Sequence, residues 1–510
     1  MSGLKVRFGL FYLGKVMKSN KLSKTDYILG LQCPLALWFK YYRKDLKPSI
    51  TEEQQVLFDT GHEIGAYANQ YFAPGFKVCA SYCELEEGLK QTKEAIIKGE
   101  ETIFEAVVQA SNGTYSRIDI LRKNPDADGW DLIEVKSSTE RKDYHLDDIS
   151  FQYYVFKNAG YQVRDCYLML VNNEYVRNGE IDPKQLLKLE LVTDKAIEKY
   201  STVETVSTNL MRVLESNTPP KQNIGAHCNT PFECDYRHHC WKHVPEYSVF
   251  NIFNKKKAEE LYKVYGANIA NLPEERWPTG AKGKDALDFL KDEERVDKKA
   301  IHGFLQTLKY PFYFLDYETF SHAVPVLDGT RPYQQVPFQF SLHIQQSSNG
   351  ELKHIEFLHC EKSDPRPAFA KALVEFCGEK GSVIVYNQIF EKGRNKELQE
   401  TFPYLAGRIS NISERIVDLL LPFKNRHIYS PKQNSSASLK VTLPIFTNLS
   451  YDNMKVGDAL TASRMYLNYQ RGMLSEVEME SMFKNLSTYC KQDTLAMVEL
   501  LEVLKRKISK

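Results

Sequence analysis

Residues 103–137 read IFEAVVQASNGTYSRIDILRKNPDADGWDLIEVKS and hold three strand-length segments in succession. These segments are Ile103–Ala110, Tyr115–Leu121 and Asp131–Ser137. A helix-length segment and a further strand come next, at Leu146–Phe156 and Cys166–Val171. The order strand, strand, strand, helix, strand predicts a sheet with a helix packed on it, and therefore an α/β domain.

The third of these strands carries charged side chains on one face. Because side chains alternate along a strand, Glu134 and Lys136 point one way while Ile133 and Val135 point the other. Asp119 is available from the neighbouring strand. Two carboxylates can hold a hard cation such as Mg²⁺, and the lysine can orient the water that attacks a phosphodiester.

With Asp119 on the second strand, Glu134-x-Lys136 on the third and Gln152 on the following helix, this region resembles the PD-(D/E)XK nucleases of the RecB type. In that family the glutamine lies in a Q-x-x-x-Y motif, and Phe156 stands here at the tyrosine position. The resemblance implies a restriction-endonuclease-like fold, catalysis by Asp119, Glu134, Lys136 and Gln152, and Mg²⁺ or Mn²⁺ as cofactor.

The same resemblance adds a metal-binding acid on the first strand, Glu105. Such families also supply a histidine from a G-x-x-x-H motif, but Gly65 stands at that position here. His62 is nearby and out of register, so we do not expect it to bind metal.

Ten cysteines are present, in a chain whose expected compartment is the reducing cytoplasm, where structural disulfides are not expected. Six of them are scattered and are interpreted as isolated thiols: Cys79, Cys83, Cys166, Cys360, Cys377 and Cys490. The other four combine one early residue with a late trio: Cys33, Cys228, Cys234 and Cys240. Four thiolates can hold a 4Fe–4S cluster or one Zn²⁺.

The wide separation of Cys33 from the trio is unlike zinc modules, which pair nearby cysteines two by two. It resembles the iron–sulfur subset of RecB-like nucleases, in which the cluster ties the start of the domain to its end. That resemblance implies a 4Fe–4S cluster, with Zn²⁺ or free cysteines as the alternatives. His227, His238 and His239 are then interpreted as loop or phosphate-contact residues.

A second acidic pattern begins at the strand Phe312–Phe320, which carries Asp316 and Glu318 on one face. Two adjacent carboxylates repel each other unless a cation neutralises them. Further strands are predicted at Phe338–Gln345, His354–His359 and Ser382–Tyr386, with helices at Pro367–Cys377 and Leu486–Lys507. On the last helix, Tyr489 and Asp493 are four residues apart and share a face.

A D-x-E strand, the segment Asn387-Gln388-Ile389-Phe390-Glu391 and a terminal Y-x-x-x-D helix resemble the DEDDy 3′–5′ exonucleases. That family implies an RNase H-like fold, in which Asp316, Glu318, Glu391 and Asp493 bind two metal ions and Tyr489 positions the attacking water. Glu391 replaces the family's usual aspartate, and Asp418 is a substitute ligand.

Short motifs extend the resemblance over nearly the whole chain: Ser438-Leu439-Lys440, Leu443-Pro444 and Gly457-Asp458-Ala459. With them the sequence resembles an uncharacterised bacterial family that joins a RecB-like N-terminal domain to an RNase H-like C-terminal domain.

At 510 residues the chain is too long for one hydrophobic core. The pattern predicts four parts, which are an extension at 1–21, a nuclease domain at 22–245, a helical connector at 246–305 and an RNase H-like domain at 306–510. The connector pattern rests on the helical spacing of Phe253, Ala258, Leu261 and Val264. Met1 and Met17 are both candidate start residues.

Charge and hydropathy narrow the function classes. Lys and Arg (67) and Asp and Glu (66) leave a net charge of +1, which excludes a strongly basic nucleic-acid coat but permits a local groove. No apolar run is long enough to span a membrane, and no signal peptide is recognised, so a cytoplasmic location is expected.

The expected function is a metal-dependent nuclease, with DNA that has single-stranded ends as the partner and exonucleolytic action. The alternative is a non-catalytic nucleic-acid-binding or scaffold protein with a zinc staple and degenerate nuclease folds.

Overall fold

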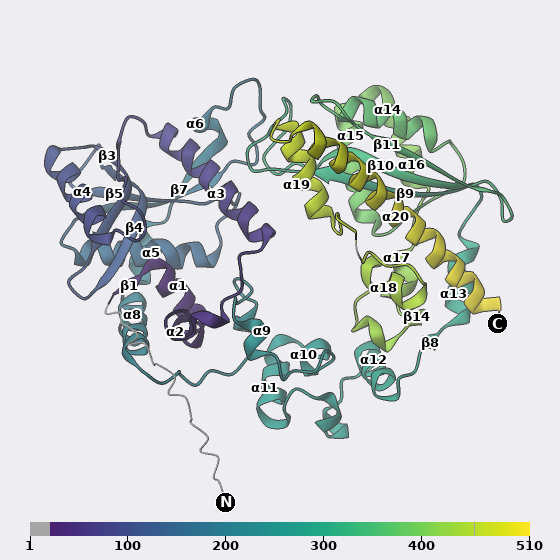
Figure 1. Ribbon diagram of the computed structural model, residues 1–510, viewed down its shortest axis with the longest axis horizontal. Helices are drawn as coiled ribbons and strands as arrows, with labels where there is room; N and C mark the ends of the chain where they lie inside the picture. Colours follow the sequence, from purple (N-terminus) through teal and green to yellow (C-terminus); the bar gives the residue numbers. More distant parts are fainter. Residues whose placement is uncertain (1–20, 453, 510) are drawn as a thin grey trace, which may run out of the picture. The chain divides into compact units, whose positions relative to one another are not determined.

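The computed structural model describes residues 21–452 and 454–509 (Figure 1). The extension predicted at 1–21 and the choice between Met1 and Met17 lie outside these residues, apart from Lys21. The chain divides into two compact units. The first unit runs to Asn173 and resumes at Ile181–His243; the second comprises Glu174–Glu180 and the chain from Val244 onward.

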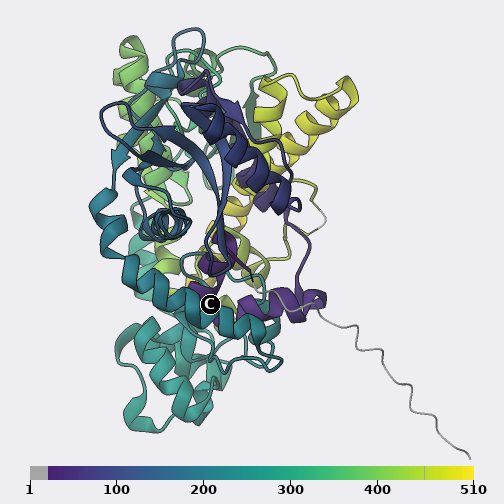
Figure 2. The same cartoon turned by 90° about the vertical axis from the view of Figure 1, so that its left-hand side faces the viewer.

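The first unit is built on a mixed sheet in the order β2-β3-β4-β5-β6-β7, and β1 pairs with β4. Its strands are β1 (Leu22–Ser23), β2 (Phe76–Lys77), β3 (Thr102–Gln109), β4 (Thr114–Lys123), β5 (Trp130–Val135), β6 (Val163–Val171) and β7 (Leu187–Leu191). β3, β4 and β5 are antiparallel neighbours, whereas β6 runs parallel to β5. In Figure 2 the dark blue strands of this unit curve strongly, as the twist of such a sheet requires.

Parallel neighbours need a crossover connection, and α5 (Asp143–Asn158) makes it between β5 and β6. Every residue of α5 from Asp148 to Phe156 is buried, because the helix packs on the sheet and also against α1, α7 and α8. The helices of four or more residues are α1 (Lys24–Gln32), α2 (Pro34–Tyr42), α3 (Glu52–Tyr71), α4 (Leu85–Lys98), α5, α6 (Pro183–Leu186), α7 (Thr193–Glu198), α8 (Tyr200–Glu215) and α9 (Arg237–Cys240).

The second unit has a five-stranded sheet in the order β11-β10-β9-β12-β13. The strands are β9 (Phe312–Phe320), β10 (Val336–Gln345), β11 (Leu352–Leu358), β12 (Ser382–Val385) and β13 (Ile416–Asp418). β9, β10 and β11 form an antiparallel meander, and β12 and β13 add to β9 in parallel. In addition, β8 (Arg295–Val296) and β14 (Ile428–Tyr429) form a separate two-stranded antiparallel sheet.

Helices cover this second sheet, and α20 runs along β9 and β10. They are α13 (Lys298–Gln306), α14 (Arg366–Phe376), α15 (Gln388–Thr401), α16 (Ala406–Glu414), α17 (Leu420–Lys424), α18 (Leu439–Phe446), α19 (Ala459–Gln470) and α20 (Glu476–Ser509). The predicted α/β class is confirmed in both units. The final helix begins ten residues earlier than predicted, because Glu478 accepts hydrogen bonds from both the backbone and the hydroxyl of Ser475 and so caps it.

The segment predicted as a connector belongs to the second unit and has its own apolar cluster. Its helices are α10 (Val249–Ile252), α11 (Lys255–Tyr265) and α12 (Gly280–Lys291), and its predicted end at residue 305 falls inside α13. Ala258 and Leu261 are buried on α11 as their spacing predicts, but Val264 is 71% exposed and Phe253 precedes the helix. The apolar face of α11 is therefore narrower than predicted.

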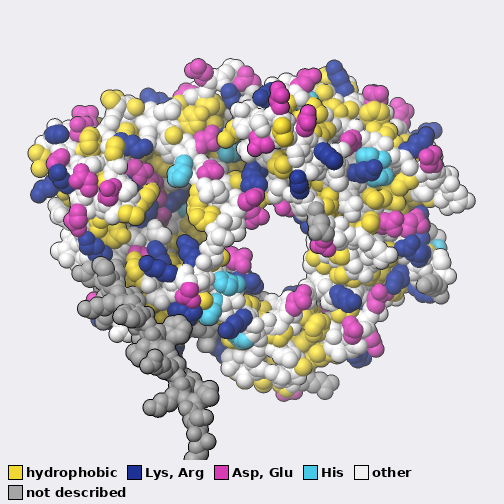
Figure 3. All heavy atoms as spheres, in the orientation of Figure 1, with side chains coloured by type: hydrophobic (Ala, Val, Ile, Leu, Met, Phe, Trp, Pro, Cys, Tyr) yellow, Lys and Arg dark blue, Asp and Glu magenta, His cyan; other side chains and the backbone are white. Residues whose placement is uncertain are grey.

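Across the part of the chain that the structure describes, no helix has the length and apolarity to cross a bilayer. On the face shown in Figure 3, basic and acidic side chains are interspersed, in keeping with the net charge of +1.

Candidate functional site

The predicted acids of the first unit lie on three adjacent strands, β3, β4 and β5. The Asp119 carboxylate on β4 accepts a hydrogen bond from the backbone amide of Val135 (2.8 Å), which holds it beside β5. The register of β3 and β4 pairs Phe104 with Ile120 and Ala106 with Ile118, so Glu105 and Asp119 both lie between these two pairs, where Glu105 has a positive φ of 58°. The structure therefore brings Glu105 and Asp119 together across one strand pair.

Glu134 is the centre of a charged network. Its carboxylate is buried and accepts hydrogen bonds from Lys136 Nζ (2.6 Å), Lys24 Nζ (2.8 Å) and Gln152 Nε2. The predicted grouping of Glu134, Lys136 and Gln152 is thus present in the fold. Asp148 pairs with Lys136 and also lies 3.3 Å from Lys24 Nζ.

Two members of this network, Lys24 and Asp148, were not among the predicted residues. Asp148 lies one helical turn before Gln152 on α5, so the i, i+4 spacing of the two residues was a usable signal. Lys24 opens α1, immediately after the capping residue Ser23. It is 110 positions from Glu134 in sequence, and only the tertiary fold brings them together.

Burial and charge act in opposite directions on these groups. Burial and the Asp119 charge act to raise the pKa of Glu134, but Lys136 and Lys24 outweigh them and lower it. Burial acts to lower the pKa of Lys24, but the carboxylates of Asp148 and Glu134 raise it well above its usual value. For Asp119, burial prevails and raises the pKa. The network is therefore ionised around Glu134, while Asp119 holds its proton more tightly.

A cavity of about 420 Å³ opens beside these groups, and Lys24, Lys40, Glu105, Arg117 and Asp119 are among the residues that line it. Burial raises the pKa of Glu105. His62 is exposed on α3 and is not part of this lining. The cavity combines oxygen ligands for a cation with ammonium and guanidinium groups for a phosphate.

The four cysteines predicted to bind a cluster line one small pocket, and they are Cys33, Cys228, Cys234 and Cys240. Cys33 joins α1 to α2, Cys228 and Cys234 are linked by a backbone hydrogen bond, and Cys240 ends α9. The side-chain amide of Gln32 donates to the carbonyls of His227 and Phe232 (both 2.7 Å) and so fastens the two distant segments together. Burial raises the pKa of Cys234 to about 11, so the thiol is neutral unless a metal binds it.

The three nearby histidines have contacts of other kinds. His238 Nδ1 lies 3.1 Å from the carbonyl oxygen of Asp235, and His239 packs edge-on against the ring of Phe39. His227 Nε2 lies 3.7 Å from Cys228 Sγ and lines the cysteine pocket.

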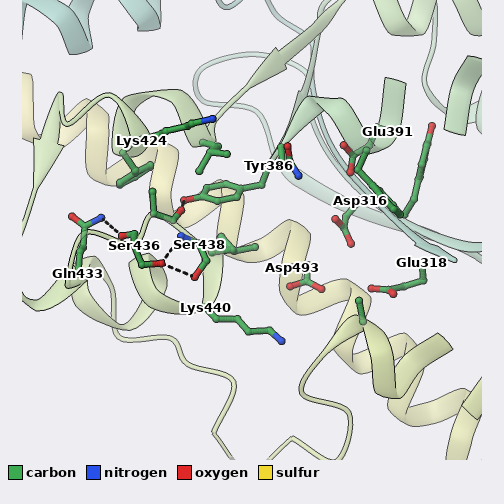
Figure 4. Close-up of a pocket in the computed structure, with 18 of the residues that line it drawn as sticks. Asp316, Glu318, Tyr386, Glu391, Lys424, Gln433, Ser436, Ser438, Lys440 and Asp493 are labelled. Carbon is green, nitrogen blue, oxygen red and sulfur yellow. Dashed lines mark hydrogen bonds between the residues drawn. The ribbon is translucent and has the colours of Figure 1, made fainter. Parts of the chain in front are cut away.

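In the second unit, the five predicted residues line a single cavity of about 750 Å³ (Figure 4). Asp316 and Glu318 come from β9, Glu391 from α15, and Tyr489 and Asp493 from α20. Residues far apart in sequence thus converge on one acidic centre, as predicted.

These carboxyl groups are crowded; those of Glu318, Glu391 and Asp493 are buried, and that of Asp316 is half-buried. Burial, followed by the neighbouring charge of Asp493, raises the pKa values of Asp316 and Glu318 well above their usual range. Burial raises the pKa of Asp493 to about 7 and that of Glu391 to about 8. The hydroxyl of Tyr451 donates a hydrogen bond to Asp493, a contact that the sequence did not reveal. Such a centre favours positively charged ligands.

One carboxylate oxygen of Glu391, Oε2, lacks a hydrogen-bond partner among the described residues. Glu391 itself is 2% exposed. Asp418, the substitute ligand, has both oxygens occupied by backbone amides, including those of Asn387 and Gln388, at the start of α15. It does not line the cavity, so its role as a substitute ligand is not supported.

Cys490 joins this centre, although it was interpreted as an isolated thiol. Its Sγ lies 3.9 Å from Asp316 Oδ2, and the ligand atoms of Asp316, Glu318 and Cys490 all lie within 4.8 Å of one another. This trio is the metal-sized group found among the described residues. Cys490 follows Tyr489 directly in the Y-x-x-x-D helix, but its direction of projection could not be read from that spacing.

Comparison with known proteins matches residues 313–438 to a family described as "Domain of unknown function (DUF2779)". The match begins in β9 and ends just before α18. It therefore includes Asp316, Glu318 and Glu391, but not α20.

The chain is also similar to uncharacterised proteins of Mycoplasma and Ureaplasma. The chain is 27% identical over 218 residues to "Uncharacterized protein MG366 homolog" of Mycoplasma pneumoniae, covering 38% of this chain and 32% of that protein. It is 24% identical over 244 residues to "Uncharacterized protein UU173" of Ureaplasma parvum, covering 43% and 35%. The matched region thus spans about a third of the length of these curated relatives.

A solved structure titled "Crystal structure of SSO0001" aligns with 45% of this chain and 90% of its own, at 15% identity. The TM-score is 0.22, which is too low to establish a shared fold.

Proposed function

We propose that this chain is a metal-dependent nuclease that hydrolyses phosphodiester bonds, acting on DNA from its ends. The observation that carries the proposal is the convergence of Asp316, Glu318, Glu391 and Asp493 with Tyr489 on one cavity. Four crowded carboxyl groups with raised pKa values, three of them buried, are costly to ionise without cations. Divalent ions at such a centre would stabilise the attacking and leaving oxygens of an in-line displacement.

The residues of the second unit suit this chemistry. The unpartnered oxygen of Glu391 and the close group of Asp316, Glu318 and Cys490 supply the ligand atoms that a divalent ion needs. Asp493 is oriented by the Tyr451 hydroxyl. Tyr489, one turn before Asp493 on α20, would position the attacking water. The strand order β11-β10-β9-β12-β13 supports the RNase H-like interpretation.

The first unit supports a second centre of the PD-(D/E)XK kind. Its strands and α5 follow the predicted order, and Glu134, Lys136 and Gln152 are in direct contact. Glu105 and Asp119 line the adjoining cavity with oxygen atoms suited to Mg²⁺ or Mn²⁺. Lys136 would hold the attacking water, and Gln152 fixes the Glu134 carboxylate.

We further propose that Cys33, Cys228, Cys234 and Cys240 hold a 4Fe–4S cluster. Four thiolates around one zinc ion, at Zn–S distances of about 2.3 Å, lie about 3.8 Å apart. The four cysteines share one pocket. Cys33 is distant in sequence from the other three, unlike zinc modules that pair nearby cysteines, and this separation supports a cluster.

A nuclease assay on end-labelled single- and double-stranded DNA and RNA, with Mg²⁺ or Mn²⁺, tests the proposal. E134Q/K136M disables the first centre and D316N/D493N the second. We expect each double variant to retain the cleavage activity of the other centre. The variant that combines all four substitutions should cleave at least about 100-fold more slowly than the unmodified chain.

Two exposed glutamates provide matched controls. E140Q lies between β5 and α5 in the first unit, and E480Q lies on α20 in the second. Both should cleave like the unmodified chain. Unchanged cleavage by the combined variant would sink the proposal, and cleavage confined to RNA would change its substrate.

A further inference from the structure

The cavity of the second unit has a wall that the four carboxylates do not occupy. This wall comes from the segment that enters α18, and its members lining the cavity are Gln433, Ser435, Ser436, Ser438, Leu439 and Lys440. Figure 4 shows the Lys440 side chain extending from this wall toward Asp493 and Glu318. The cavity therefore has an acidic side and a side that carries a cation and hydroxyl groups.

Lys440 is the charged member of that wall. It is the second residue of α18, and it makes no ion pair within 4.0 Å among the described residues. Its Nζ lies 6.0 Å from the ring centroid of Tyr489, and its charge acts to lower the pKa values of Glu318 and Asp493. It is thus close enough to act on the acidic centre without being held by it.

The start of α18 adds donors to the same wall. The first amides of a helix have no intrahelical acceptors, and they favour an anion. The side chain of the capping residue Ser438 makes no capping hydrogen bond. Because Ser438, Leu439 and Lys440 all line the cavity, the beginning of this helix faces it.

An independent observation indicates that the cavity takes a ligand. Glu391 is 2% exposed and lines the same cavity, and its Oε2 lacks a partner among the described residues. A buried oxygen without a partner is costly, so a bound group is expected to complete it. A cation bound at Glu391 would in turn bind an anionic group of the substrate. That group would lie within reach of the wall that carries Lys440.

We propose that Lys440 and the first turn of α18 form a phosphate subsite that faces the carboxylates across the cavity and binds the phosphate of a nucleotide or polynucleotide end. This inference rests on the proposed nuclease function and adds a substrate-contacting residue to it. Apolar side chains of the same lining, among them Leu420, Phe423 and Phe390, offer a surface for the sugar and base.

Calorimetric titration with thymidine 5′-monophosphate in the presence of Mn²⁺ tests the subsite, with thymidine as the probe that lacks the phosphate. We expect the monophosphate to bind at least about 10-fold more tightly than the nucleoside. K440M should lose about 10-fold or more of the monophosphate affinity, and K440R should retain most of it, because charge-assisted contacts to phosphate account for that difference.

Two further measurements separate this role from simple charge balance. K440M should bind Mn²⁺ as tightly as the unmodified chain or more tightly, because a cation beside the carboxylates has been removed. K432M, at an exposed lysine of the same segment outside the lining, should bind both ligands normally. Circular dichroism verifies that each variant is folded.

The outcomes distinguish the two proposals. Normal monophosphate affinity in K440M, or no preference for the monophosphate over thymidine, overturns the subsite while Mn²⁺ binding still supports the nuclease. Absence of Mn²⁺ binding in the unmodified chain, with D316N/D493N unchanged from it, overturns the nuclease centre. In that case the same titrations are repeated without metal. Weaker binding of the monophosphate by K440M than by the unmodified chain then supports the subsite, and equal binding overturns it.

Discussion

At the scale of single residues, the first centre is defined by a buried glutamate between two lysines. Glu134 pairs with Lys24 and Lys136, and both lysines also pair with Asp148. Two carboxylates and two ammonium groups satisfy one another without a metal ion. The Lys24 ammonium therefore competes with any cation that approaches Glu134.

Replacing Lys24 tests this competition. K24M should lower the free energy of unfolding of the metal-free chain by about 1–3 kcal/mol, because charged hydrogen bonds to Glu134 are lost. Saturating Mn²⁺ should restore much of that loss by binding the freed carboxylates. Thermal unfolding with EDTA and with Mn²⁺ measures both effects. K93M, at an exposed lysine on α4, is the control; an equal loss with and without Mn²⁺ would contradict the competition.

The acids of the second unit predict how stability depends on pH. The pKa values of Asp493 and Glu391 are raised to about 7 and about 8, above their values in an unfolded chain. The folded chain therefore holds protons that the unfolded chain has released, and stability falls as pH rises from about 4 to about 8.

We expect this fall to amount to about 2–4 kcal/mol in the metal-free chain. Urea unfolding at several pH values with EDTA measures it, and D493N/E391Q should flatten the profile. Adding Mn²⁺ should reverse the trend above neutral pH, since the metal binds the deprotonated acids. A stability that rises with pH in EDTA would show that these carboxyls are already ionised.

At the scale of elements, the cysteine pocket joins segments that are distant in sequence. Cys33 lies where α1 meets α2, and Cys228, Cys234 and Cys240 lie beyond α8. A cluster here would close a very long loop, which constrains the unfolded chain most strongly. The Gln32 hydrogen bonds and an apolar cluster that includes Phe39 and Tyr236 already join these segments, and a metal cluster would add to them.

Cys33→Ser should abolish binding of the proposed cluster. We expect loss of the broad absorbance near 400 nm, loss of iron and acid-labile sulfide, and a lower unfolding temperature of the first unit. Anaerobic purification with metal analysis checks this. C79S, at an exposed cysteine, should keep full iron content. Zinc in place of iron in the unmodified chain would contradict the cluster.

At the scale of the whole molecule, two units have separate apolar cores. Leu168 on β6 belongs to the core of the first unit, and Leu342 on β10 to a core of the second; both are fully buried. The connector helices add a further cluster within the second unit. Multidomain chains of this kind unfold in more than one step.

Calorimetry should therefore show at least two transitions. Leu168→Ala and Leu342→Ala should each destabilise one unit by about 2–5 kcal/mol, because each leaves a cavity in a packed core. Each substitution should shift a different transition, and Mn²⁺ should identify the transition of the second unit in an E134Q/K136M background. A single transition that both variants shift equally would refute independent cores.

Much of the fold could be predicted because its signals are local. Strand alternation placed Glu134 and Lys136 on one face, and the strand Phe312–Phe320 has the predicted bounds. The i, i+4 spacing put Tyr489 and Asp493 on one side of α20. Periodicity and spacing operate within a few residues, so they can be read from the chain itself.

The sequence by itself therefore determined the α/β class, the order of the central strands and of the helices beside them, and the acidic residues that converge in each unit. Only the tertiary structure decided the partners of those acids: Lys24 and Asp148 beside Glu134, and Tyr451, Cys490 and Lys440 beside Asp493 or Asp316. These partners come mostly from distant segments, and the direction in which a side chain projects depends on how the elements pack. That packing is a property of the assembled core, and no local spacing encodes it.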